Sequence, residues 1–210
     1  MYIPKHFREE DLAQLHSFMQ QHPFTLIVTN QDGVPVGSHV PLILDNQQGP
    51  YGTLLGHFAR GNQQWQTFDG SQQALVVFQE PHAYISPTWY EEPTKSVPTW
   101  NYAVVHAYGT PRIIDDHEEL MRLLAAQREV FEAPIENPWP FEQSDEWIQK
   151  MARGVVGFSI AISRLEGKFK LNQNRTIRDQ ERVASALSTA SDSASTSIAS
   201  LMHNRLKPAE

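Results

Sequence analysis

The sequence of 210 residues contains no cysteine. This absence excludes disulfides, thiolate nucleophiles and cysteine-ligated zinc or iron–sulfur clusters. Long hydrophobic runs are also missing, because apolar stretches such as Ala74–Phe78 and Ala103–Val105 are far shorter than the roughly 20 residues of a membrane-spanning helix. The first residues are charged and lack the apolar segment of a signal peptide. We therefore expect a soluble, cytoplasmic protein without membrane contact.

Several catalytic signatures are absent. No Gly-x-Gly-x-x-Gly, P-loop or Gly-x-Ser-x-Gly pattern occurs, which argues against dinucleotide-binding, P-loop and α/β-hydrolase enzymes. The nine histidines include no His-x-x-x-His pair, so their spacing predicts no metal site. A site assembled from separate strands by His39, His57, His82 and His106 stays open, although His106 is better explained as a structural residue.

Positive charge is scarce. The formal net charge is −7, whereas nucleic-acid-binding domains usually show a basic surface. The segment 164–182 is a local exception, with six basic residues against three acidic ones. Because acidic residues lie among the basic residues of this segment and no helix-turn-helix pattern occurs, direct DNA contact is not expected.

Hydrophobic patterning predicts a mainly β protein with peripheral helices. Apolar residues at helical spacing predict helices over 9–21, 116–131, 144–153 and 176–187. β-Branched and apolar runs bounded by turn residues predict strands near 24–29, 34–44, 51–58, 74–86, 100–114 and 155–163. No regular βαβ alternation occurs, so an antiparallel barrel or strongly curled sheet is the expected α+β architecture.

One domain is expected over 1–187. The segment 188–210 is rich in Ser and Ala, and we interpret it as a C-terminal tail. It is either a loose linker before a short helix over 198–206 or a frayed end.

The most informative segment is Gly56–Trp65, with the sequence GHFARGNQQW. It runs from a strand end, through a turn at Gly61, into one or two helical turns expected over 62–68. A helix start offers backbone N–H groups and a positive dipole end to an anion, and Arg60 and His57 add side-chain donors. The alternative is structural, with Arg60 as a surface cation and Trp65 in the core. An isolated motif of this kind is more often structural.

A second segment is Val97–Tyr102, with the sequence VPTWNY. Trp100 and Tyr102 beside Thr99 and Asn101 could form a stacking surface with polar groups at its edge, as a flavin ring requires. Taken alone, such a pattern more often reflects core packing.

Six segments in consistent order, covering residue 1 to about 185, together resemble the PaiB family. They are Met1–Pro4, Gly56–Trp65, Pro81–Ser86, Val97–Tyr102, His106–Gly109 and Glu166–Leu171. That family is described as FMN-binding negative transcriptional regulators with the split-barrel fold of pyridoxamine-phosphate oxidases and flavin reductases. The family is expected to have proline where this chain has Gln63. Because proline favours the start of a helix, Gln63 should soften the turn without removing the anion site. The resemblance implies an FMN-binding split β-barrel that acts as a homodimer, because a second subunit normally closes the flavin pocket.

The resemblance also implies cofactor-binding positions, carried over by motif: Ser38, His39, Val40, Leu42, His57, Arg60, Asn62, Trp100, Asn101 and Lys168. The backbone around 38–42 is expected to meet the edge of the flavin ring, and the turn over 57–62 to meet the phosphate. Trp100 and Asn101, or Lys168, are candidates for the wall that the second subunit contributes.

Three functions remain from the sequence. The first is an FMN-binding regulatory or redox-sensing protein. The second is an FMN-dependent oxidoreductase, similar to a flavin reductase or a pyridoxamine-phosphate oxidase, that acts on a small substrate. The third is a repressor that contacts DNA directly. No catalytic residue follows from the sequence for any of them.

Overall fold

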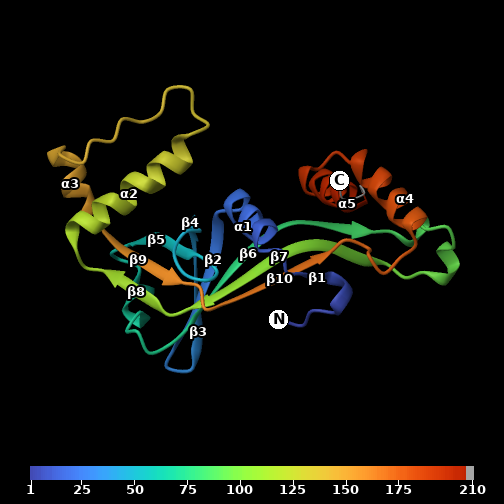
Figure 1. Ribbon diagram of the computed structural model, residues 1–210, viewed down its shortest axis with the longest axis horizontal. Coiled ribbons are helices and arrows are strands. Elements are labelled where there is room, and N and C mark those ends of the chain that lie inside the picture. Colours follow the sequence, from blue (N-terminus) through green and yellow to red (C-terminus); the bar gives the residue numbers. More distant parts are fainter. Residues whose placement is uncertain (207–210) are drawn as a thin grey trace. The chain divides into compact units, whose positions relative to one another are not determined.

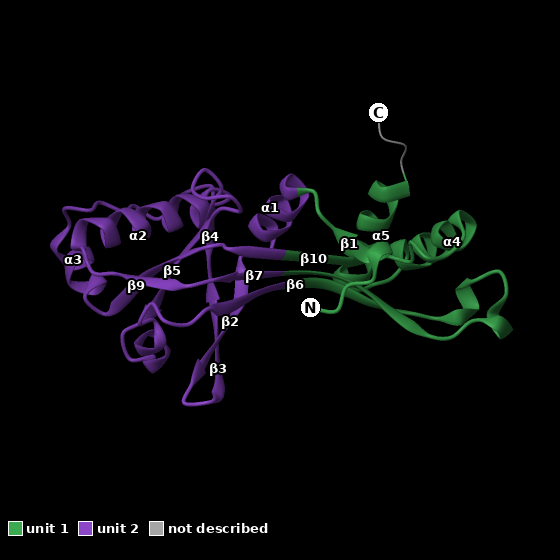
Figure 2. Cartoon of the chain, turned by 60° about the horizontal axis from the view of Figure 1, so that its bottom comes forward, with its two compact units in different colours: residues 1–11, 79–105, 166–210 green, residues 12–78, 106–165 purple. Residues whose placement is uncertain are grey.

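The computed structural model describes residues 1–206, which form two compact units (Figures 1 and 2). One unit, here the first unit, contains Met1–Asp11, Gln79–Val105 and the chain from Glu166 onward. The second unit contains Leu12–Phe78 and His106–Leu165.

The strands form two sheets whose registered pairs are antiparallel. The larger has the order β1-β10-β7-β6-β2-β3, with bounds Arg8–Glu9, Arg164–Lys170, Thr99–Gly109, Ala74–Ile85, Phe24–Gln31 and Val34–Pro41. The smaller has the order β4-β5-β9-β8, with bounds Ile43–Asp45, Thr53–Ala59, Val155–Ala161 and Pro111–Ile114. Strand β3 is therefore an edge strand.

The helices lie between and after the strands (Figure 1). The α-helices are α1 Leu12–Gln21, α2 His117–Glu132, α3 Glu146–Ala152, α4 Ile177–Ser188 and α5 Ser193–Leu206. The short 3₁₀ helices are η1 Lys5–Phe7, η2 Gln63–Thr67, η3 Pro87–Trp89 and η4 Pro93–Lys95. Within the described chain no helix is long and apolar enough to cross a membrane. The mainly β class with peripheral helices is confirmed.

The turn between β2 and β3 follows from two residues. Asp32 and Gly33 both have positive φ angles, of 54° and 85°, which is the geometry of a two-residue type I′ turn. The Gly33 N–H also donates to Asn30 Oδ1 at 2.8 Å. This turn sets the hairpin register, in which Gln31 pairs with Val34 and Phe24 with Pro41.

Two predicted strands are each divided between the sheets. The strand expected over 34–44 becomes β3 and β4, which belong to different sheets and are separated at the buried Leu42. The Leu42 N–H donates to Pro23 O at 2.9 Å, which extends the pairing of β2 and β3 by one residue before the chain changes sheet. The strand expected over 100–114 becomes β7 and β8. There Gly109 lies so close to the end of β9 that a Cβ atom on it would be 2.3 Å from Ala161 O.

The helix expected over 9–21 begins later, at Leu12. Arg8 and Glu9 are extended instead and pair, as β1, with Lys168 and Gly167 of β10. The Glu9 carboxylate accepts the N–H groups of Glu10 and Asp11, and it also binds Arg205 Nη1 at 2.7 Å. These contacts hold the chain extended, so the helix cannot begin there.

The C-terminal segment is more helical than the sequence indicates. Helix α5 begins at Ser193, five residues before the short helix expected from 198, because Asp192 Oδ1 accepts the Ser195 N–H at 2.8 Å as a cap. Ile198, Ala199 and Met202 are buried on one side of α5. Residues 207–210 of the expected tail lie outside the described residues.

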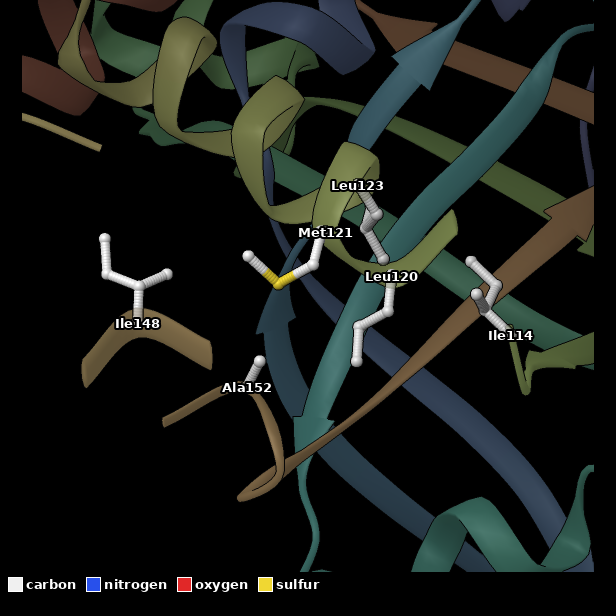
Figure 3. Packing of buried hydrophobic residues seen from close by; sticks show 6 residues of the cluster. All are labelled: Ile114, Leu120, Met121, Leu123, Ile148 and Ala152. Atoms are coloured by element: carbon white, nitrogen blue, oxygen red, sulfur yellow. The ribbon is translucent and has the colours of Figure 1, made fainter. Parts of the chain in front are cut away.

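The core of the second unit contains a group of aromatic side chains from β5, β9 and the residue that follows η2. Phe58 and Phe158 have ring centroids 4.9 Å apart, and Phe68 lies 5.2 Å from Phe158. A neighbouring apolar cluster joins β8, α2 and α3 (Figure 3): Ile114, Leu120, Met121, Leu123, Ile148 and Ala152. This cluster positions α2 and α3 beside β5.

Candidate functional site

Arg60 lies in the turn that follows β5. Its Nε donates to Arg153 O at 2.8 Å and one Nη donates to Val155 O at 2.9 Å, while its backbone N–H donates to Gly154 O at 2.8 Å. Two of the five guanidinium N–H groups are used in this way, which leaves three. Because both acceptors are neutral carbonyls, the positive charge of this exposed side chain is fixed in place but not neutralised.

Asn62 and Ser38, two predicted site residues, are in direct contact. Asn62 Nδ2 donates to Ser38 Oγ at 2.8 Å, and Asn62 Oδ1 accepts the Gln64 N–H at 3.0 Å as the N-cap of η2. The expected helix start is present, but η2 has only five residues. Its dipole is therefore small, and the first-turn N–H of Gln64 is already used. Any strong anion attraction at this turn comes from Arg60.

Gln64 is a residue that the sequence reasoning missed. Its side chain is buried, and its Nε2 lies 3.2 Å from Ile27 O, 3.1 Å from Thr29 Oγ1 and 3.0 Å from Val36 O. Its Oε1 has no hydrogen-bond partner among residues 1–206. Gln64 thus ties the segment after the Arg60–Asn62 turn to the hairpin of β2 and β3. No periodic pattern marks it.

His57 points toward α2 instead of the aromatic core. Its Nδ1 lies 2.7 Å from Gln127 Oε1, and Gln127 Nε2 donates to Pro41 O at 3.4 Å. Gln127 was also missed. It lies four residues after Leu123 on the apolar stripe of α2, and a polar residue in such a stripe is a usable signal for a buried contact. Val130, which lies three residues later in α2, is 52% exposed.

A cavity of about 340 Å³ lies beside His57 within the second unit. Its lining is mostly apolar and comes from β3, β5, β9, α2, α3 and the loop between α2 and α3: Pro41, His57, Leu124, Gln127, Arg128, Phe131, Glu132, Trp139, Phe141, Trp147, Ile148, Met151, Ala152 and Val155. Ile148 and Ala152 also belong to the cluster in Figure 3. This volume is within the range of small-molecule sites, roughly 300–1,000 Å³.

The loop over the cavity is fastened to α2 at Trp139. Arg128 Nε donates to Trp139 O at 2.8 Å, and Glu132 Oε2 accepts the Trp139 N–H at 2.8 Å. Residues 128 and 132 are one helical turn apart, so both side chains reach the same peptide. The two side chains fix the position of Trp139, whose ring meets Phe141 edge-on at 5.7 Å.

The candidate residues of β3, and Leu42 directly after it, differ in exposure. His39 is exposed and stacks on Phe24 with ring centroids 6.0 Å apart. Val40 and Leu42 are buried, so their side chains are not at a surface. Because β3 is an edge strand, one row of its backbone groups lies outside the β2 ladder.

The other three candidates belong to the first unit. Trp100 is exposed and meets the rings of His82 and Tyr84 at 5.9 and 5.8 Å. Lys168 Nζ lies 5.2 Å from the ring centroid of Tyr102. Asn101 is fully buried, and its Nδ2 is 3.5 Å from Met202 Sδ. Within the part of the chain that the structure describes, its Oδ1 has no hydrogen-bond partner. Its side chain is therefore in the interior of the unit.

Lys170 adds a perturbed charge to the first unit. Its Nζ donates to Thr99 Oγ1 at 2.7 Å and also to the Trp100 carbonyl. Burial lowers the pKa of Lys170 below 10.5, and the positive charges of Lys168 and Arg175 lower it further.

The basic segment 164–182 is largely used in contacts within each unit. Arg164 stacks over the ring of Tyr108 at 3.6 Å. Within the first unit, Arg178 pairs with Glu91 at 2.6 Å and Arg182 Nε donates to Trp89 O at 2.8 Å. Among residues 1–206 no group of three or more His, Asp or Glu side chains is arranged to hold a metal ion.

The two-sheet architecture with helices at its periphery defines the class as a split β-barrel. The flavocytochrome Anf3 of Azotobacter vinelandii has this fold in common with the chain, with a TM-score of 0.62 at 13% identity over 83% of this chain and 73% of that one. The FAD and heme binding protein of Mycobacterium smegmatis gives a TM-score of 0.58 at 13% identity over 78% and 73%. These likenesses establish the fold.

Sequence comparison identifies the family. The model described as "Putative FMN-binding domain" matches residues 1–164. The protease synthase and sporulation protein PAI 2 of Bacillus subtilis is 36% identical over 99% of both chains. The chain belongs to this FMN-binding-domain family, and the resemblance to PaiB is confirmed. A yeast relative, the uncharacterized protein YKL070W of Saccharomyces cerevisiae, is 34% identical over 60% of this chain and 86% of its own length.

Proposed function

We propose that the chain is a cytoplasmic FMN-binding protein with a regulatory or redox-sensing role. The observation that carries this proposal is the exposed, unneutralised guanidinium of Arg60, held by the carbonyls of Arg153 and Val155. A cation fixed in this way loses little side-chain freedom when a phosphate arrives, and its remaining N–H groups can bind phosphate oxygens. The family description supports FMN as that ligand.

The residues near this turn fit an FMN molecule. The phosphate is assigned to Arg60 and to the open turn at Gly61, where an added Cβ would meet nothing within 4 Å. The Ser38–Asn62 pair lies at the same turn and offers a hydroxyl group. The free edge of β3 is assigned to the polar edge of the flavin ring. When bound, FMN supplies reversible electron transfer, and the chain supplies its binding and orientation.

We further propose a homodimer that uses an exposed surface of the first unit, here called the aromatic face: Tyr2, His82, Tyr84, Trp100, Tyr102 and Lys168. Tyr84 is 47% exposed, Trp100 52% and Tyr2 82%, and large exposed apolar surfaces mark interaction sites. Aromatic side chains are enriched in the cores of protein interfaces. Trp100 and Lys168 are then available to a flavin pocket completed by a second copy, whereas the buried Asn101 is assigned a structural role.

An FMN-dependent oxidoreductase is the second candidate, favoured by the cavity beside His57, which has room for a substrate. A DNA-contacting repressor is less well supported, because several basic side chains of 164–182 are engaged within the units and the net charge is −7. Reduction of bound FMN by NAD(P)H with multiple turnovers would favour the enzyme. Tight FMN binding without turnover would favour the sensor.

The decisive experiment titrates wild type and Arg60→Ala with FMN and with riboflavin, which lacks the phosphate. Loss of a charge-assisted pair costs about 1.5–3 kcal/mol, so FMN affinity should fall roughly 10- to 150-fold while riboflavin affinity changes little. The variant should also melt at a lower temperature, because two carbonyl contacts are lost.

Arg122→Ala is the matched control, since Arg122 is an exposed arginine of α2 with a single weak ion pair at 3.8 Å to Glu118. It removes the same charge and should leave both affinities unchanged. Equal losses for FMN and riboflavin in Arg60→Ala would remove Arg60 as the phosphate ligand.

A further inference from the structure

The cavity beside His57 has a largely aromatic lining. Four aromatic side chains line it: Phe131, Trp139, Phe141 and Trp147. Trp147 is 60% exposed and Met151 is 46% exposed, although both are apolar and both line the cavity. A flat apolar molecule inside the cavity would cover these surfaces and could stack on or meet the rings edge-on.

The polar group at the His57 side of the cavity has a defined hydrogen-bonding role. Gln127 Nε2 donates to Pro41 O, which turns Gln127 Oε1 toward His57 Nδ1. Because an amide oxygen can only accept, His57 Nδ1 must carry the hydrogen of this 2.7 Å bond. In the neutral imidazole, Nε2 is then an acceptor, and the structure gives it no partner within the described chain.

The charged groups of the lining indicate a neutral guest. Arg128 and Glu132 have opposite charges, and both are engaged with the backbone of Trp139. The cavity therefore presents no net charge that would attract an ion, and its remaining lining is apolar apart from His57 and Gln127.

We propose that this cavity binds a neutral, planar compound of two or three fused rings that carries one O–H or N–H group. The rings lie among the aromatic side chains, and the donor group binds His57 Nε2. Val155 lines the cavity and its carbonyl oxygen accepts the Arg60 guanidinium, so the cavity adjoins the phosphate turn. The guest's donor group and the phosphate use different side chains, His57 and Arg60, so we expect the guest and FMN to bind together. The proposal goes beyond the flavin function and does not depend on it, because the cavity lies within one unit of a single chain.

Isothermal titration calorimetry of the purified full chain, with and without saturating FMN, tests this with three probes. 2-Naphthol carries the rings and the donor, 2-methoxynaphthalene lacks the donor, and 2-naphthoate is an anion. We expect 2-naphthol to bind once per chain, with or without FMN. The ether should bind about 3- to 10-fold more weakly, in keeping with one lost hydrogen bond, and the anion more weakly still.

Trp147→Ala should weaken 2-naphthol binding at least about 3-fold, in keeping with loss of one aromatic contact. Because Trp147 is 60% exposed, this substitution should not unfold the protein. Trp89→Ala is the matched control, because Trp89 lies in the first unit and should leave binding unchanged. The proposal is overturned if 2-naphthol does not bind at millimolar concentration, if naphthol and ether bind equally, or if FMN displaces naphthol. A protein that binds naphthol but no FMN would refute the proposed function and leave this site standing.

Discussion

Replacing Gln64 by Met should lower stability and loosen the candidate phosphate turn. The Gln64 amide places two N–H groups among three acceptors on β2 and β3, at 3.0–3.2 Å. Two net hydrogen bonds at about 0.5–1.5 kcal/mol each give a loss of about 1–3 kcal/mol. Met fills a similar volume and removes the buried Oε1 that lacks a partner, which offsets part of the cost and keeps the expected value near 2 kcal/mol.

For a chain of this size, about 2 kcal/mol corresponds to a fall in melting temperature of about 4–8 °C. Thermal unfolding followed by circular dichroism measures it. Gln63→Met is the matched control, because Gln63 is exposed and makes only a 3.4 Å contact with Gly61 O and an exposed contact with Gln66. The control should stay within about 0.5 kcal/mol of wild type.

A second measurement connects this perturbation to the ligand. Gln64 lies two residues after the Arg60–Asn62 turn, and its backbone N–H donates to Asn62 Oδ1. Gln64→Met should therefore weaken FMN binding more than riboflavin binding. If Gln64→Met and Gln63→Met melt together, the three contacts of Gln64 do not stabilise the hairpin and the reasoning is wrong.

Two further predictions concern the first unit. Because the pKa of Lys170 is lowered in the folded state, the unfolded state binds the proton more strongly. The free energy of unfolding should therefore rise as the pH increases through the folded pKa toward 10.5. Urea unfolding should show a flatter dependence on pH for Lys170→Met, and the same pH dependence as wild type would contradict this prediction. Sedimentation of the wild type should give a dimer of about 48 kDa, twice the mass of the 23.9 kDa chain. The double variant Tyr84→Ser with Trp100→Ser should sediment as a monomer, because it removes two aromatic side chains from the aromatic face. A wild-type monomer at micromolar concentration would refute the dimer.

Local patterns predicted the parts of the fold that local chemistry decides. The Asp32–Gly33 turn between the strands expected over 24–29 and 34–44 needs only two residues that tolerate positive φ. The change of sheet at Leu42 and Gly109 was missed, although Pro41 and Gly109 are residues that weaken a strand. Such a residue does not show which sheet the chain joins next, because that depends on contacts with distant segments.

The same distinction holds for the candidate site. The motif at 56–65 located the turn, and the carried-over positions Ser38 and Asn62 are in contact there. The partners of Gln64 and His57 were missed, because Gln64 and Val36 are 28 residues apart and His57 and Gln127 are 70 residues apart. A single sequence contains no signal for such pairings beyond one polar residue in an apolar stripe.

The attachment of Trp139 to α2 has a practical consequence for protein engineering. Arg128 and Glu132 hold the peptide of residue 139 from within the preceding helix, so the exposed residues 133–138 form an arch with both ends fixed. Lengthening such an arch costs little, since each doubling of loop length adds only about 0.6 kcal/mol of closure entropy. We therefore expect that additional residues can be inserted at 133–138. Such insertions should change access to the cavity while the lining residues of α2 and α3 stay in place.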